Sequence, residues 1–251
     1  MRVKKLYIIC FILFVFSFLR VQSQDVAWKT ITKEEMANVF EQLSNWFKSP
    51  SVYSFTVTHA SYENYKTIVP YEKSVGYFKR DKINYHSFLL GIHTIQNKKY
   101  KISVDTASKI IMVANVDSSS WDTYKLDDYK VLLESCVAIK VFNEKTDKHY
   151  RLEFREGYPL SSYEFLIAAN GVLKEITWYY AKEVQKDPDD EHSAKVKPRL
   201  NITFSDYKKN QVFNYKNEFD ESVYFFNKGN KLVVTEKYKK FEISDQRLIL
   251  N

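Results

Sequence analysis

The sequence predicts an α+β fold in which a curved antiparallel sheet is packed by helices on its concave face. Three observations lead to this prediction. Aromatic residues make up 16% of the chain, and such residues favour pleated, half-buried positions. Short segments of alternating apolar and polar residues recur along most of the chain. Two amphipathic helices are expected, one before these segments and one between them.

The first 24 residues have the pattern of an export signal. Three basic residues lead into an apolar run over residues 6–19, and the small residues that follow suit cleavage before Gln24. The run is shorter than the roughly 20 residues that a membrane-spanning helix needs, and no second run of that kind follows. We therefore expect residues 1–24 to be a signal peptide and residues 25–251 to form a single exported domain without a transmembrane segment. The expected location is the periplasm, with secretion to the medium as the alternative.

Charge and cysteine content narrow the classes of partner. Four of the 38 basic residues lie in the signal, which leaves 34 against 31 acidic residues, a balance of +3. The basic residues are scattered among acidic ones, so no nucleic-acid partner is expected.

Cys136 is the single cysteine after the signal, which rules out an intramolecular disulfide. We interpret it as a buried inert thiol, the alternative being a nucleophile served by a distant histidine.

Two segments have helical periodicity. From Thr32 to Phe47, apolar residues recur at spacings of three and four, Thr32 is placed as the N-cap with Glu35 three residues on, and Pro50 bars continuation. A second, shorter helix is expected from Asp127 to Val137, capped by Asp127 and carrying Cys136 on its apolar side.

The remaining pattern is that of strands. Ala169-Asn170-Gly171 marks the clearest hairpin, since Asn-Gly tolerates the positive φ angles of a tight turn. A polar stretch over residues 184–198 is expected to be an exposed loop. The expected strands lie within residues 53–57, 75–77, 100–104, 110–112, 139–142, 150–154, 163–168, 172–180, 199–204, 223–226 and 231–238.

Familiar catalytic and cofactor motifs are missing from the sequence. The five glycines lie far apart, so no nucleotide-binding loop can be formed, and neither a serine-nucleophile elbow nor zinc-ligand spacing occurs. His86 and His93, seven residues apart, would lie on opposite faces of a regular strand and could not share a metal. We expect a non-enzymatic protein with no cofactor, metal or catalytic residue; an exported hydrolase without recognised motifs is the alternative.

The excess of aromatic and aliphatic side chains on the expected strands has two interpretations. These side chains could line a cavity if the sheet curls around unfilled space, or they could fill an ordinary core, because alternation indicates only which face is buried. The candidate cavity residues are Tyr85, Phe88, Leu90, Ile92, Phe165, Ile167, Ile176, Trp178 and Tyr180.

Four blocks of sequence resemble a known family. Residues 76–86 read Gly-Tyr-Phe-Lys-Arg-Asp-Lys-Ile-Asn-Tyr-His, and together with residues 97–112 they resemble the early hairpins of the periplasmic lipoprotein-carrier family (LolA/LolB-like). Residues 165–178 and 200–210 are similar to that family's later paired strands, one with a turn followed by Leu-x-x-Ile and one ending Ile-x-Phe. The blocks follow one N-terminal helix and cover most of the chain after the signal.

This resemblance implies both a fold and a function. The family's fold is an incomplete (half-open) antiparallel β-barrel closed by helices, whose apolar cavity holds acyl chains. Lys79 or Arg80 would be the counterpart of the family's cavity arginine. The implied function is that of a periplasmic carrier or binding protein that shelters the acyl chain of a lipid or lipoprotein in outer membrane biogenesis, with inner- or outer-membrane components as partners. The alternative is a periplasmic protein-interaction or sensor module of the same fold without lipid cargo.

Overall fold

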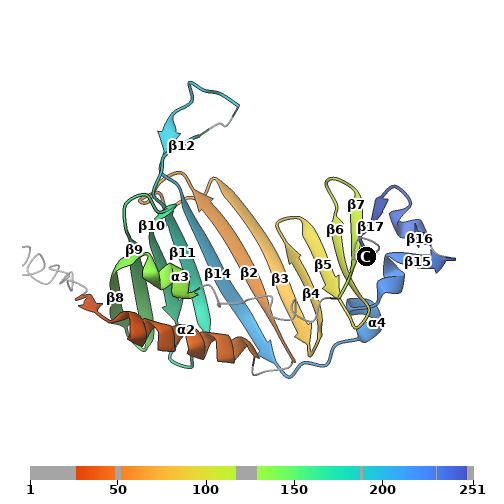
Figure 1. The fold of residues 1–251 in the computed structure, drawn as a ribbon, viewed down its shortest axis with the longest axis horizontal. Coiled ribbons are helices and arrows are strands. Elements are labelled where there is room, and N and C mark those ends of the chain that lie inside the picture. Colours follow the sequence, from red (N-terminus) through yellow and green to blue (C-terminus); the bar gives the residue numbers. More distant parts are fainter. Residues whose placement is uncertain (1–26, 49–51, 117–128, 187–188, 230, 248–251) are drawn as a thin grey trace, which may run out of the picture.

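One open sheet of thirteen strands forms the body of the protein (Figure 1). The computed structural model describes residues 27–48, 52–116, 129–186, 189–229 and 231–247. The strands of the large sheet, in sequence order, are β1 (Lys29–Thr30), β2 (Val52–Tyr62), β3 (Glu72–Asp81), β4 (Asn84–Leu89), β5 (Ile92–Gln96), β6 (Tyr100–Asp105), β7 (Ile110–Asn115), β8 (Cys136–Glu144), β9 (Asp147–Phe154), β10 (Leu160–Ile167), β11 (Leu173–Tyr180), β14 (Arg199–Lys209) and β17 (Glu242–Asp245).

Two small hairpins and several helices complete the fold. The hairpins pair β12 (Val184–Gln185) with β13 (Lys195–Val196), and β15 (Phe225–Lys228) with β16 (Lys231–Val234). The helices are α2 (Lys33–Lys48), α3 (Tyr129–Glu134), α4 (Tyr215–Glu218) and the 3-10 helices η3 (Glu221–Val223) and η4 (Glu236–Tyr238).

The strand order explains why the sheet is open. It runs β1-β8-β9-β10-β11-β14-β2-β3-β4-β5-β6-β7-β17, so β1 and β17 stand at its two ends. All neighbours are antiparallel except β17, which runs parallel to β7. α2 and α3 cover one side of the sheet over the half that contains β8 to β2, while the C-terminal elements lie at the other end (Figure 1). The predicted curved, half-open antiparallel sheet with helices on its concave face is confirmed.

The N-terminus of α2 forms the predicted capping box. The Thr32 hydroxyl accepts a hydrogen bond from the Glu35 N–H at 3.1 Å, and the Glu35 carboxylate accepts one from the Thr32 N–H at 2.7 Å. The helix then buries Met36, Phe40 and Leu43 against the sheet, at the three- and four-residue spacing that the sequence shows.

Aromatic rings dominate the core beneath α2, on the side that we call the helix face. The Phe40 ring lies 5.5 Å from that of Tyr129 in α3 and 5.6 Å from that of Phe165 in β10. A row of rings crosses three central strands, with 5.3 Å between Phe55 and Phe78 and 5.8 Å between Phe78 and Tyr85. Such offset pairs stabilise the core beyond the area that they bury.

A second core lies on the opposite face of the same sheet. Ile95, Ile102 and Ile111 are fully buried there beneath Phe225 and Leu232 of the β15–β16 hairpin. Ile95 pairs with His86, whereas the buried Gln96 pairs with Tyr85 on the helix face. Successive side chains of a strand alternate between faces, so Ile95 and Gln96 lie on opposite sides of the sheet. The helices thus cover one face at one end of the sheet, and the C-terminal segment covers the other face at the other end.

Several local predictions are corrected by the structure. The second helix covers only Tyr129–Glu134, and Cys136 begins β8 instead of ending that helix. Residues 184–198, expected to be an exposed loop, include the short β12–β13 hairpin. The two C-terminal strands form a hairpin of their own outside the large sheet, and β17 was not predicted.

Turns account for two further corrections. Leu90 and Gly91 adopt positive φ angles of 51° and 82° between β4 and β5, so the chain reverses where a continuous strand was expected. His86 and His93 therefore share one face, with ring centroids 5.9 Å apart. At the β10–β11 turn only Gly171 takes a positive φ, of 80°, whereas Asn170 does not.

Some predictions fall on parts of the chain outside the described residues. These are the signal over residues 1–24, the helix cap at Asp127 and residues 187–188 of the polar stretch. No helix within the described ranges has the length and apolar character needed to cross a membrane.

Candidate ligand-binding site

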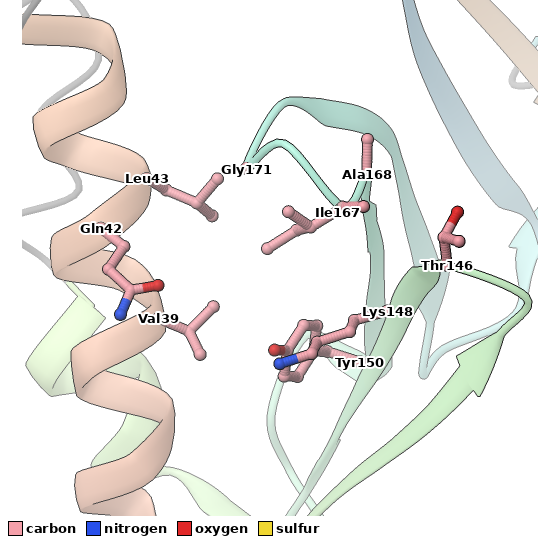
Figure 2. A pocket seen from close by; sticks show the side chains of 10 residues that line it. Val39, Gln42, Leu43, Thr146, Lys148, Tyr150, Ile167, Ala168 and Gly171 are labelled. Carbon is pink, nitrogen blue, oxygen red and sulfur yellow. The ribbon is translucent and has the colours of Figure 1, made fainter.

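A cavity of about 270 Å³ lies between α2 and the ends of β9 and β10 (Figure 2). α2 contributes to one side of it, and the β8–β9 turn, β9 and the β10–β11 turn contribute to the other. The lining residues are Val39, Gln42, Leu43, Thr146, Lys148, Tyr150, Ile167, Ala168, Ala169 and Gly171.

The walls are mainly apolar. Val39 and Leu43, one helical turn apart on α2, face Ile167 of β10 across the gap in Figure 2. Tyr150 of β9 lies in register with Phe165, and its ring lies 5.0 Å from the Phe165 ring. These contacts place the cavity at the edge of the aromatic core on the helix face.

Polar groups lie around the cavity. Gln42 belongs to α2, Thr146 to the β8–β9 turn and Lys148 to the first part of β9. The pairing of Lys148 with Ile167 places the lysine on the same face as the apolar wall. Its side chain is exposed. The cavity therefore combines apolar walls with a solvated cation, an arrangement that suits an amphipathic molecule.

Asp147 holds together the two turns that frame the cavity. Its carboxylate pairs with Nζ of Lys174, at 2.5 Å from Oδ2, and accepts a hydrogen bond from the Ala169 backbone. The hydrogen bond from Lys174 is the main reason why the pKa of Asp147 lies below its ordinary value. The β8–β9 turn is thus tied to the β10–β11 turn, which closes with a hydrogen bond of 2.8 Å from the Ala168 N–H to the Val172 carbonyl.

Of the candidate residues on β10 and β11, Ile167 is the one that lines this cavity, and the others extend from it toward the far end of the two strands. Phe165 packs behind Tyr150. Ile176 pairs with Phe165 and Trp178 pairs with Tyr163, so both lie on the helix face one strand further on. Tyr180 is half-buried at the end of β11.

The candidate residues on β4 and β5 do not share one location. Tyr85 is buried on the helix face beside Phe78, several strands away from the cavity. Phe88 lies on the opposite face, where its ring is 4.4 Å from that of His93. Leu90 lies in the turn and Ile92 follows it, and they are 65% and 39% exposed.

The two polar candidates also lie on different faces. Arg80 is on the helix face, where it pairs in register with Tyr53 and donates a hydrogen bond to the Lys82 carbonyl at 2.9 Å. Lys79 is on the opposite face and forms an ion pair of 2.9 Å with Glu218 of α4. Adjacent residues of a strand cannot both enter the same cavity.

A polar cluster surrounds this ion pair on the face opposite the helices. The Tyr77 hydroxyl lies 3.0 Å from Nε2 of His86, and Nδ1 of His86 lies 3.3 Å from the Glu218 carboxylate. Burial lowers the pKa of His86 and outweighs the opposing effect of Glu218. Burial alone would raise the pKa of Glu218, but the hydrogen bonds and charges of Lys79 and His86 lower it overall. The cluster fastens α4 to the sheet.

Sequence reasoning missed most of the residues that line the cavity. Val39 and Leu43 belong to the apolar stripe of α2, which the periodicity revealed, but the stripe does not indicate which strand ends it will cross. Lys148 lies in phase with Tyr150 and Leu152 in a strand of alternating pattern, which would have placed it on the buried face. Thr146 and Ala168 lie in turns whose mutual contact arises only in the folded sheet.

Comparisons with known proteins give similar structures and no sequence relatives. No known family profile and no curated protein matches the sequence. Similar solved structures include an uncharacterized conserved protein from Thermus thermophilus, with a TM-score of 0.40, 6% identity, and coverage of 74% of this chain and 95% of that one. A LolA superfamily protein from Nitrosomonas europaea has a TM-score of 0.28 and 8% identity, covering 76% and 99% of the two chains.

A third similar structure is a domain named as an outer membrane lipoprotein-sorting protein, from Vibrio parahaemolyticus. Its TM-score is 0.26 at 9% identity, with 76% of this chain and 97% of that one covered. A LolA superfamily protein and a lipoprotein-sorting domain are thus among the structures to which this chain is distantly similar. Superpositions this loose carry no argument about function, which depends on the geometry of this chain.

Proposed function

We propose that this protein is a periplasmic, non-enzymatic binding or carrier protein that shelters part of an acyl chain between α2 and the helix face of the sheet. The observation that supports this is the cavity of about 270 Å³ with Val39, Leu43, Tyr150 and Ile167 in its walls. Residues 1–24 would direct export, and the acyl chain would belong to a lipid or lipoprotein that moves between membranes.

The size of the cavity suits partial burial of one chain. Small-molecule sites commonly measure about 300–1,000 Å³, so 270 Å³ lies just below that range. Each methylene transferred from water contributes about 0.8 kcal/mol, so several enclosed carbons are enough for reversible binding. Reversibility is what a carrier needs, because cargo must also leave.

The lining supports binding more than catalysis. Its ten residues include no histidine, cysteine or carboxylate, which are the side chains that most often act as acid, base or nucleophile. Within the described ranges, no group of three histidine, cysteine or acidic side chains could hold a metal ion. In a binding role, the lining residues would contact the ligand and no catalytic group would be needed.

A cavity-filling substitution tests this proposal. Protein freed of lipid is titrated with the uncharged fluorescent probe N-phenyl-1-naphthylamine, whose emission rises in apolar surroundings. We expect wild-type protein to bind the probe and Val39→Trp to bind it about tenfold more weakly. Val131→Trp, a matched change at a 62% exposed position of α3, should bind as the wild type does. Equal binding by all three proteins, or no binding by the wild type, would contradict the proposal.

A protein-interaction module of the same fold is a second candidate, favoured by one exposed loop between β2 and β3. Ile68, Val69 and Tyr71 are 87%, 70% and 61% exposed. The loop is firmly held, because Nη2 of Arg199 donates a hydrogen bond of 2.8 Å to the Thr67 carbonyl. A contiguous apolar tip on an anchored loop is typical of a surface that contacts another macromolecule.

Site-specific crosslinking distinguishes this second function. A photoreactive residue next to this tip, in cells that express the protein, should capture one protein at near-equal stoichiometry. Ile68→Asp should abolish that capture, whereas Val212→Asp, at a 99% exposed position elsewhere, should leave it intact. If Ile68→Asp leaves the amount of crosslinked partner unchanged, the loop is not a docking surface.

A further inference from the structure

Lys148 contributes an unneutralised positive charge to the cavity. It is one of the ten lining residues, its side chain is exposed, and it forms no ion pair with any other residue in the described part of the chain. Asp147, the acidic residue next to it in sequence, is already paired with Lys174 and with the Ala169 backbone.

The geometry points to a single-chain amphiphile with an anionic head group as the ligand, with the Lys148 ammonium group facing that head group. This inference rests on the proposed function, since it specifies the ligand of the same cavity. The apolar wall of Val39, Leu43 and Ile167 receives the chain, and the lysine marks the end at which a charge can stay hydrated.

Two further groups of the lining can donate hydrogen bonds to a head group. The Gln42 side chain on α2 carries an amide with two N–H donors, and Thr146 contributes a hydroxyl from the β8–β9 turn. No acidic side chain is among the lining residues to repel a negative charge. A carboxylate or a phosphate monoester would each match this set, because both accept several hydrogen bonds and pair with an ammonium group.

The cavity volume limits the ligand to one chain. At about 270 Å³ the space is small even for one molecule of drug size, which favours a ligand with a single chain. A free fatty acid and a single-chain phospholipid are the two sources of this chemistry.

Calorimetric titration with three probes of equal chain length tests the inference. Dodecanoate and dodecyl phosphate carry the two anionic groups, and dodecyl maltoside is neutral; all three are used below the concentrations at which they form micelles. We expect at least one anionic probe to bind about fivefold more tightly than the maltoside, as a partly exposed ion pair allows. That preference should shrink as salt is raised. The tighter of the two anions identifies the source.

Matched variants complete the test. Lys148→Gln should remove the preference by weakening binding of the anionic probes more than binding of the maltoside, and Lys148→Arg should keep it. Lys145→Gln makes the same charge change at an exposed turn residue that does not line the cavity, and should have no effect. The inference is overturned if wild-type protein binds all three probes equally, or if Lys145→Gln acts as Lys148→Gln does. Failure of every probe to bind would contradict the proposed function itself.

Discussion

Tyr85 and His86 are neighbours in β4, yet they contact two different layers of the protein. The Tyr85 ring lies 5.8 Å from Phe78 in the core on the helix face, and His86 lies 3.3 Å from Glu218 of α4 on the opposite face. β4 therefore lies at the boundary between two halves of the sheet, one covered on the helix face and the other covered on the opposite face. Strands on one side of β4 are buried by helices, and strands on the other side are buried by the C-terminal segment.

Phe40 should be a main anchor of α2. Its side chain is 1% exposed and lies within 5.6 Å of two other rings, so Phe40→Ala would leave a cavity in the core. We expect the free energy of unfolding to fall by about 3 to 5 kcal/mol, measured by urea denaturation. Glu41→Ala, on the exposed side of the same helix, should change it by less than about 0.5 kcal/mol. A small loss for Phe40→Ala would show that α2 does not pack as described.

Attachment of the C-terminal segment should weaken in acid. The pKa of His86 in the folded protein lies below its ordinary value of about 6.5, mainly because the ring is buried. The unfolded chain therefore binds a proton more readily, so this contribution to stability is present above about pH 6.5 and is lost as pH falls through the folded pKa. The lowered pKa of Glu218 acts in the same direction at lower pH, below its ordinary carboxyl range.

Urea denaturation at a series of pH values from 7.5 to 5.0 measures this effect. We expect the free energy of unfolding to decrease less in His86→Gln than in the wild type, because glutamine can contact Tyr77 and Glu218 but does not titrate. His192→Gln, at an exposed position, is the control and should follow the wild type. Parallel curves for wild type and His86→Gln would rule out a role for His86 in the acid response.

Gly76 should tolerate no side chain. A Cβ atom at this position would lie 2.0 Å from the carbonyl oxygen of Phe88 in β4, and backbone on both sides leaves little room to adjust. We expect Gly76→Ala to reduce stability by about 1 to 3 kcal/mol in thermal or urea denaturation. Val75→Ala, at a 56% exposed neighbour, should cost under about 1 kcal/mol. An unaffected Gly76→Ala protein would mean that β3 and β4 lie further apart than described.

Cys136 should be unreactive in the folded protein. Burial raises the pKa of its thiol to about 11, and Sγ donates a hydrogen bond to the Leu132 carbonyl at 3.3 Å. Because the thiolate is the reactive form, Ellman's reagent at pH 8 should modify Cys136 only after denaturation. A cysteine introduced by Val131→Cys, at a 62% exposed site, should react at once in the same assay. Rapid reaction of Cys136 in the folded protein would instead support the alternative that this thiol is a nucleophile.

Local sequence signals predicted the parts of the fold that depend on neighbouring residues. Thr32 and Glu35 predicted the start of α2, and the alternation of apolar and polar residues predicted most strands. Both signals are local, because capping and pleating depend on residues a few positions apart. Which face each strand buries is a different matter. Alternation in β5 and β6 shows two unlike faces, but only the distant β15–β16 hairpin decides that Ile95 and Ile102 are covered on the side away from the helices.

The candidate site was predicted only in part for the same reason. Ile167 and its neighbours on β10 and β11 stood out because they are aromatic or aliphatic in alternation. Lys148 and Thr146 could be recognised only once α2 crossed the ends of β9 and β10. Phe88 and Tyr85 are three residues apart in β4, so alternation places them on opposite faces of the sheet. The turn at Leu90 and Gly91 was not signalled by the apolar run around it.

Native mass spectrometry of the protein, purified without detergent from the periplasm of cells that express it, tests the binding proposal most directly. We expect part of the population to carry the added mass of one acyl-bearing anion, and Val39→Trp to reduce that fraction while Val131→Trp does not. A wild-type protein that carries no added mass, and that gains none when dodecanoate or dodecyl phosphate is supplied, would contradict the proposal.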